Sequence, residues 1–166
     1  MSIKPNALNW LLLSVVVIAL DQWSKFWALG ALQPEGVPHA VIPGLLNWVL
    51  TFNNGAAFSF LNDGAGWQRW FFVLLALVIS GAMVVWLQRT PRRDWRTALP
   101  VSLIIGGALG NLIDRLHAAR VTDFVQVYHG DWHFAVFNLA DSAISVGAVI
   151  LLLFGLFAGK SRDGVR

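Results

Sequence analysis

The chain contains no cysteine, and only 13% of its 166 residues are charged. Without cysteine it has no disulfide framework, no thiolate metal site and no cysteine nucleophile. The scarcity of charge accompanies a hydrophobic content of 57% and a mean hydropathy of +0.62, which soluble domains of this size rarely reach. The composition therefore predicts a membrane protein.

Basic residues are few, but they give the chain a net charge of +3 and a pI near 10.0. They occur in short clusters beside apolar runs rather than along one face, which argues against a nucleic-acid partner. The clusters are Lys4, the segment 89–96, and Lys160 with Arg162 and Arg166. By the positive-inside rule all three are cytoplasmic, so both termini lie inside and the number of spans is even.

Four apolar segments are long enough to cross a hydrocarbon core of about 30 Å at about 1.5 Å per residue. We expect spans at about 8–27, 67–87, 97–113 and 138–158, with Trp residues at many of their ends. No small-residue cleavage site follows the first apolar run, so we expect it to be a retained span rather than a signal peptide.

The segments between the spans, 28–66 and 114–137, are expected on the outer side. Residues 45–52 and 121–137 are rich in Val, Phe, Trp and Tyr with partial period-two alternation, and residues 128–131 form a turn signal. We expect a small β-platform on the outer membrane surface, with a short interfacial helix at 58–68. The sequence shows no internal repeat, and we interpret residues 1–166 as a single membrane-integral domain.

Acidic side chains gather at the outer margins of the predicted spans, where ionisable groups are costly and are functional candidates by default. Counted along the predicted helices, Asp21, Asp114 and Asp141 reach a similar depth, and the platform carries Asp123 toward them. Taken alone, Asp141 is explained as an acid near the positive end of a helix. Two carboxyls brought to one partly dry place share a proton, so we interpret Asp123 and Asp141 as a catalytic pair.

The other polar residues have simpler explanations as well. Asn111, Asp114 and Arg115 share one helix face, and an ion pair with a structural role is the favoured interpretation. Asp21 and Lys25 form an i, i+4 pair that either neutralises itself or contacts a head group, and both alternatives stay open. Asn53 and Gly55 lie in a turn signal, where the carboxamide is also a potential donor to a peptide.

Other chemistries have weaker support. His129 and His133 are four residues apart on a predicted hairpin, and no His-Glu-x-x-His pattern is present, so we expect no metal site. Ser80 and Gly81 suggest a membrane serine protease, but no predicted span holds a His as base. A small proton-coupled transporter using the acids as a relay is the main alternative function, and a passive scaffold is a third.

Five blocks of the sequence together resemble the successive signatures of lipoprotein signal peptidase, the type II signal peptidase of bacteria. They occur in the expected order and cover nearly the whole chain. The blocks are Asp21-Gln-Trp-Ser-Lys25, Asn53-Asn-Gly-Ala-Ala-Phe-Ser59, Gly106-Gly-Ala-Leu-Gly-Asn-Leu-Ile-Asp-Arg115, Val121-Thr-Asp-Phe124 and Phe137-Asn-Leu-Ala-Asp141.

The resemblance implies a multi-pass aspartic peptidase of the bacterial inner membrane, with four transmembrane helices and an active site facing the outer side. It implies cleavage of prolipoproteins just before a cysteine that carries a diacylglyceryl group, without cofactor or metal. Asp123 and Asp141 match the catalytic pair. The partners expected are the lipid-modified prolipoprotein and membrane lipids, and we expect a monomer. The candidate substrate-binding or supporting residues are Asn111, Arg115, Asn138, Asn53, Asp21, Asp114 and Gly55.

Overall fold

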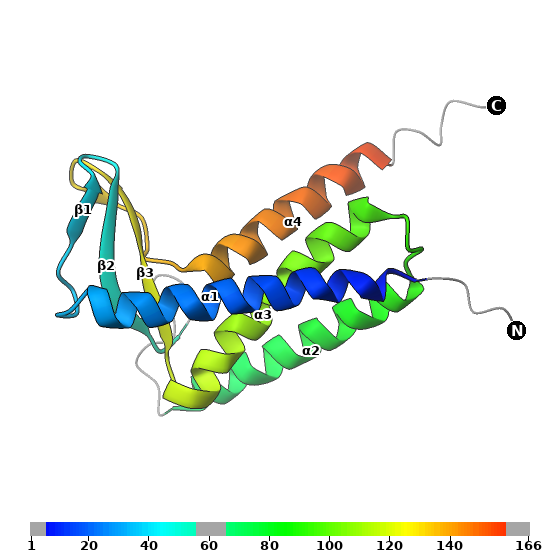
Figure 1. Ribbon diagram of the computed structural model, residues 1–166, viewed down its shortest axis with the longest axis horizontal. Helices are drawn as coiled ribbons and strands as arrows, with labels where there is room; N and C mark the ends of the chain where they lie inside the picture. The colour runs from blue at the N-terminus through cyan, green and yellow to red at the C-terminus, as the bar shows by residue number, and fades with distance from the viewer. Residues whose placement is uncertain (1–5, 56–65, 159–166) are drawn as a thin grey trace, which may run out of the picture.

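The computed structural model describes residues 6–55 and 66–158, which form a bundle of long helices with a small antiparallel sheet at one end (Figure 1). The elements in chain order are the 3₁₀ turn η1 (Ala7–Trp10), α1 (Leu11–Ala31), β1 (His39–Ile42), β2 (Leu46–Asn53), α2 (Trp67–Arg89), α3 (Trp95–Ala118), β3 (Val121–His129), β4 (Trp132–His133) and α4 (Leu139–Ala158). The sheet order is β1-β2-β3-β4.

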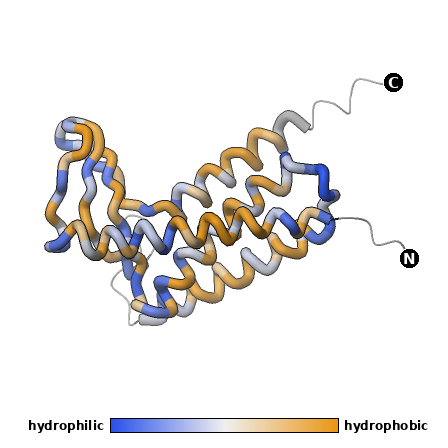
Figure 2. Tube along the Cα trace, in the orientation of Figure 1, coloured by the Kyte–Doolittle hydropathy of each residue, from blue (hydrophilic) through white to orange (hydrophobic). Residues whose placement is uncertain are grey.

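Among the residues that the structure describes, three stretches are long and apolar enough to cross a membrane: Ala7–Ala31, Trp67–Arg89 and Trp95–Ala118. Their large apolar side chains are widely exposed on α1 and α2, as expected of surfaces that face lipid tails. The fourth predicted span corresponds to α4, whose apolar part Leu139–Gly155 is shorter. The loop between α2 and α3 is strongly hydrophilic (Figure 2), as the cluster of basic residues at 89–96 requires.

The third helix extends at both ends beyond the span predicted at about 97–113. It begins at Trp95 because the Asp94 side chain caps it, accepting a hydrogen bond from the Thr97 amide at 3.3 Å. It ends at Ala118, where Ala119 takes a left-handed conformation with φ of 63°. A helix can extend beyond the part that crosses a membrane, so the expected span of about 97–113 stays a prediction. Asp114 and Arg115 lie inside the helix, and so does His117, although no predicted span contained a histidine.

α3 is the centre of the bundle and packs against α1, α2 and α4. Its glycines permit this close approach. Gly106 faces Val17 of α1, a side chain at Gly107 would collide with the Ala140 carbonyl oxygen of α4, and a Cβ at Gly110 would lie 2.6 Å from the Asp21 carboxylate. The small-xxx-small spacing of residues 106 and 110 is thus used for helix packing.

The sheet confirms the two predicted strand segments and adds one strand. Residues 45–52 correspond to β2, and residues 121–137 contain β3, a turn at Gly130 and Asp131, and β4. β1 was not predicted, and it is a short strand whose four residues are all exposed. The predicted interfacial helix at 58–68 falls mostly outside the described residues, and Trp67 and Gln68 begin α2 instead.

Aromatic side chains join the sheet to α1. Trp27 makes edge contacts with Trp48 of β2 and Phe124 of β3, with ring centroids 5.8 and 6.3 Å apart. Trp48 and Phe124 also contact each other at 5.9 Å. Such pairs contribute about 0.5–1.5 kcal/mol each beyond their buried area, so they help to hold β3 in a fixed position relative to the helices.

Candidate active site

Asp123 lies on strand β3 of the sheet. It lies opposite Thr51 in the β2–β3 pairing, and only 2% of its surface is exposed. Its two carboxyl oxygens are each held by a carboxamide: Oδ1 accepts from Asn138 Nδ2 at 2.7 Å, and Oδ2 accepts from Asn53 Nδ2 at 3.3 Å. Asn53 is the last residue of β2, and Asn138 directly precedes α4. The carboxyl of Asp123 is therefore held by side chains from two other parts of the chain.

Asp141 is held by the first turn of α4. The Asn138 side chain accepts from the Asp141 amide at 2.9 Å, and the Asp141 carboxyl accepts from the Asn138 amide at 3.2 Å. This reciprocal arrangement is a capping box with an aspartate in the third position. The helix cap therefore fixes the backbone and side chain of Asp141 together.

Two asparagines connect the acids. Besides binding Asp123, Asn138 Nδ2 donates to Asn111 Oδ1 at 3.1 Å, and Asn111 Nδ2 donates to Asp141 Oδ1 at 2.8 Å. Asn138 is fully buried and Asn111 nearly so. One connected set of carboxamides thus contacts both carboxyls, although they come from β3 and α4.

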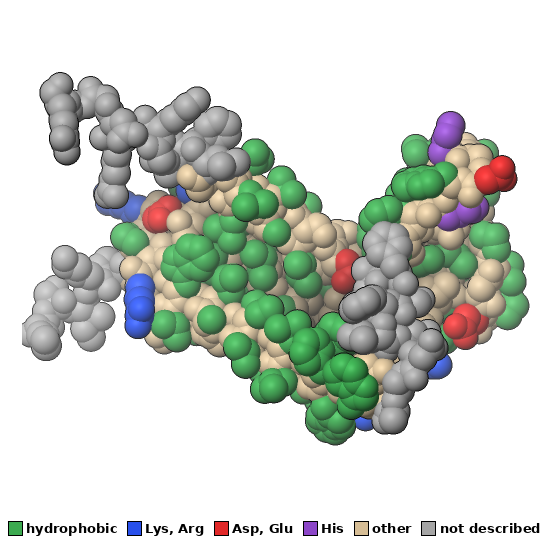
Figure 3. Space-filling model, turned by 180° about the vertical axis from the view of Figure 1, so that it is seen from behind, with side chains coloured by type: hydrophobic (Ala, Val, Ile, Leu, Met, Phe, Trp, Pro, Cys, Tyr) green, Lys and Arg blue, Asp and Glu red, His purple; other side chains and the backbone are tan. Residues whose placement is uncertain are grey.

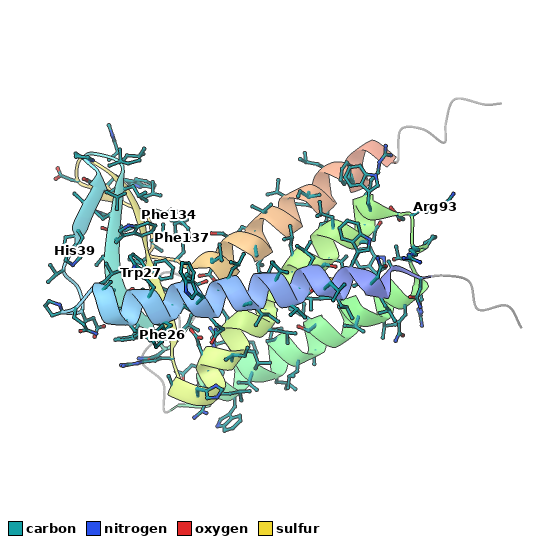
Figure 4. All side chains as sticks on the ribbon, viewed as in Figure 1. Phe26, Trp27, His39, Arg93, Phe134 and Phe137 are labelled. Atoms are coloured by element: carbon teal, nitrogen blue, oxygen red, sulfur yellow. The ribbon has the colours of Figure 1, made fainter. Side chains whose placement is uncertain are left out.

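Both acids line one cavity of about 560 Å³. The surface of the molecule is hollowed between the helices and the sheet (Figure 3). Phe134 and Phe137 lie between the sheet and the start of α4 (Figure 4), and they belong to the cavity wall. The cavity is polar around the carboxyls and apolar elsewhere. Its apolar lining includes Phe134, Val136, Phe137, Ile144 and Val146.

The Asp123 carboxyl has a raised pKa. Its pKa is raised from 3.8 to about 7, chiefly by burial and in addition by the nearby charge of Asp141. The hydrogen bonds from Asn138 and Asn53 and the charge of Lys25 oppose this rise. At neutral pH the site is therefore close to the point at which a single proton is gained or lost.

Arg115 closes the cavity on the side of α3. Its guanidinium donates to the Gly55 carbonyl oxygen at 3.1 Å and to the Asn111 carbonyl oxygen at 3.4 Å, and it lies 4.9 Å from the centroid of the Phe72 ring. Gly55 is itself held by the Asn53 side chain, which accepts from its amide at 2.9 Å. The side chain of Asn53 therefore both stabilises the turn at Gly55 and donates a hydrogen bond to Asp123.

Asp21, Lys25 and Asp114 form a buried ion cluster next to the segments that carry Asp123 and Asp141. Lys25 Nζ lies 2.8 Å from an Asp21 oxygen and 3.0 Å from an Asp114 oxygen. The sequence left open whether Asp21 and Lys25 neutralise each other or contact a head group. Both side chains are buried, and they pair with each other inside the protein. Asp114 pairs with Lys25 rather than with its neighbour Arg115.

A family model described as signal peptidase (SPase) II matches residues 13–157. The chain belongs to the signal peptidase II family. Membership of a peptidase family makes the chain a hydrolase of the membrane, and it does not favour the transporter alternative.

Relatives in this family are similar over almost the full chain. The lipoprotein signal peptidase of Xanthomonas campestris pv. campestris (strain 8004) is 59% identical over 157 residues, which cover 95% of this chain and 93% of the relative. That of Xylella fastidiosa (strain M12) is 56% identical over 156 residues, covering 94% and 93%.

Solved structures support the same fold. A bacterial membrane enzyme determined by the in meso method at 2.3 Å resolution matches with a TM-score of 0.81 and 28% identity, covering 100% of this chain and 98% of that one. A second, at 1.9 Å, matches with a TM-score of 0.73 and 29% identity, covering 98% and 99%.

The structure brings the predicted site residues together around the cavity and the adjoining ion cluster. Those near the cavity are Asp123, Asp141, Asn111, Arg115, Asn138, Asn53 and Gly55, while Asp21 and Asp114 lie in the ion cluster. Sequence reasoning missed Gln22, which donates to Asp114 at 2.8 Å, and it gave Lys25 no part in the site. The signal for Lys25 was present, because a lysine inside an apolar span needs a partner.

None of the histidines, which all lie within the described residues, lines the cavity. The His133 ring stacks on Tyr128 of β3, with centroids 5.7 Å apart and planes 9° from parallel. Within residues 6–55 and 66–158, no group of three or more His, Cys, Asp or Glu side chains is placed to hold a metal ion.

Proposed function

We propose that the chain is an aspartic endopeptidase that removes the signal peptide from diacylglyceryl-modified prolipoproteins, cleaving before the lipidated cysteine. The observation that carries the proposal is the pair of carboxyls from β3 and α4, joined through Asn138 and facing one cavity. The names of the relatives agree with this substrate. The largely apolar cavity wall suits a substrate that carries acyl chains.

The proposed reaction uses one ionised and one protonated carboxyl. The ionised carboxylate takes a proton from a water held between the two acids, and the water oxygen attacks the scissile carbonyl carbon. The protonated carboxyl donates its proton to the carbonyl oxygen, which gives a neutral tetrahedral intermediate. Collapse of this intermediate breaks the C–N bond: the departing nitrogen takes a proton from the carboxyl that acted as base, and the other carboxylate takes back a proton from a hydroxyl of the intermediate, which restores both acids and forms the new carboxyl group.

The surrounding residues position these groups. Asn138 and Asn111 each donate to one oxygen of Asp123 and Asp141 respectively, while the other oxygens accept from the Asn53 side chain and the Asn138 amide. A carboxylate oxygen has two lone pairs, so each oxygen keeps one for water or substrate. Arg115 borders the cavity with donors suited to a carbonyl or head-group oxygen. We further propose that α4 is the fourth membrane span, that the sheet lies on the outer surface, and that both termini are cytoplasmic.

The substrate proposal is tested by cleavage of one precursor in two forms, with and without the diacylglyceryl group on its cysteine. We expect turnover of the lipidated form and a reduction of kcat/KM of at least about 10²-fold without the lipid, because acyl chains bury a large apolar area. Matched detergent and substrate concentrations control for solubility. Equal rates on the two forms would contradict the substrate assignment.

The pH dependence of cleavage follows from the raised pKa of Asp123. Below about pH 7 this carboxyl keeps its proton, and above about pH 7 it becomes charged and no longer serves as a proton donor. We therefore expect kcat/KM to fall as the pH rises through about 7. Thermal unfolding over the same pH range shows whether the fold persists. Activity that stays constant up to about pH 9 would rule out a shared proton with this affinity.

A further inference from the structure

Lys25 is a buried cation whose donors are all in use. It lies in α1 with 3% of its surface exposed. Its ammonium contacts Asp21 and Asp114 and donates to Asn111 Oδ1 at 2.9 Å. An ammonium has three N–H donors and no acceptor, so each donor has one oxygen partner here. Lys25 does not line the cavity.

The contact with Asn111 determines how that carboxamide is oriented. Asn111 Oδ1 accepts from Lys25 and from Asn138, so both of its lone pairs are occupied. Rotation of the amide by half a turn would place its NH₂ group against the ammonium, where no hydrogen bond is possible. The NH₂ group is thereby directed at Asp141 Oδ1, which it contacts at 2.8 Å.

The carboxylates bound to Lys25 also hold the backbone next to both acids. Asp21 Oδ1 accepts from the amide of Ala140, the residue before Asp141, at 2.9 Å. Asp114 Oδ2 accepts from the amide of Thr122, the residue before Asp123, at 3.1 Å. The cluster therefore touches α4 and β3 immediately beside the two carboxyls.

We propose that Lys25 is a positioning residue for the reaction: its ammonium fixes the Asn111 amide so that Asn111 holds the Asp141 carboxyl in its reactive orientation. This inference rests on the proposed role of the two acids. A purely structural role for Lys25 predicts lower stability with unchanged chemistry in the molecules that remain folded. Positioning predicts a lower kcat with KM preserved.

Removing Lys25 alone leaves two buried carboxylates without their cation, and that variant is at risk of not folding. The test therefore compares Asp21→Asn with the double variant Lys25→Met/Asp21→Asn. One positive and one negative charge are lost together in the double variant, so the net charge of the cluster stays as in the wild type. Asn at position 21 retains an oxygen for the Ala140 amide.

We expect the double variant to have a kcat about 10- to 100-fold below that of Asp21→Asn, with KM within about twofold, which corresponds to loss of a charge-assisted hydrogen bond. If Lys25 acts through Asn111, the same comparison in an Asn111→Ala background gives no further loss. Lipidated precursor is the substrate, and thermal unfolding measures the folded fraction.

The proposal is overturned if the double variant keeps the kcat of Asp21→Asn, or if the loss is equally large in the Asn111→Ala background. Failure of the double variant to fold also overturns it, because Lys25 is then a folding residue. The proposed function fails by a different result, namely retained turnover when Asp123 or Asp141 itself is replaced.

Discussion

Replacement of Asp123 or Asp141 by Asn is expected to reduce kcat by about 10³-fold or more, because each change removes one member of an acid–base pair. Asn keeps the size of Asp and one acceptor oxygen, which can still accept from Asn138 at position 123 or from Asn111 at position 141, so we expect the fold to persist. KM for a lipidated precursor is expected to change little, since the apolar cavity wall is untouched. Steady-state cleavage of purified protein measures both constants.

Asp94→Asn is the matched control for this prediction. Asp94 caps α3 at the opposite end of that helix, and Asn is an equally good capping residue. The control variant should therefore keep both its stability and its activity. Turnover within a few-fold of the wild type in either site variant would remove that carboxyl from the mechanism.

Asn138→Ala is expected to have the second-largest effect on activity, a decrease in kcat of about 10²-fold. The variant loses the side-chain hydrogen bonds to Asp123, Asn111 and the Asp141 amide together. It also loses a helix cap, which costs about 1 kcal/mol of stability. The two acids then remain in the protein without the group that joins them, and cleavage of the lipidated precursor measures the result.

Asn47→Ala separates this effect from the general loss of a buried carboxamide. Asn47 is a buried asparagine on β2 whose side chain donates to Gln126 at 3.1 Å, and it does not line the cavity. We expect this variant to lose stability but to keep its kcat. A similar loss of kcat in both variants would show that Asn138 acts through the sheet as a whole rather than at the acids.

Local patterns in the sequence predict much of the fold. Long apolar runs locate the four helices, and the alternation at 121–127 locates β3, because both signals depend on which side chains avoid water. Helix ends are harder to predict: α3 continues to Ala118, since Arg115, Leu116 and His117 are all compatible with a helix. β1 has no buried face, so its residues carry no pattern that marks a strand.

The site was predictable as a set of residues and not as an arrangement. The acids stand out because ionisable groups are rare in apolar segments. What the sequence does not encode locally is the rotation of α1 against α3, which brings Lys25 to an asparagine 86 positions away. That contact depends on the close approach permitted by Gly106 and Gly110. The partner of a buried charge is therefore determined by packing between helices.

The central claim is that Asp123 and Asp141 act on one water as a single unit. Single-turnover cleavage by Asp123→Asn, Asp141→Asn and the variant carrying both changes tests it most directly. Groups that act as a unit are strongly non-additive, so the double variant should be no slower than the slower single variant. Losses that multiply in the double variant would show two independent carboxyls and would contradict the account.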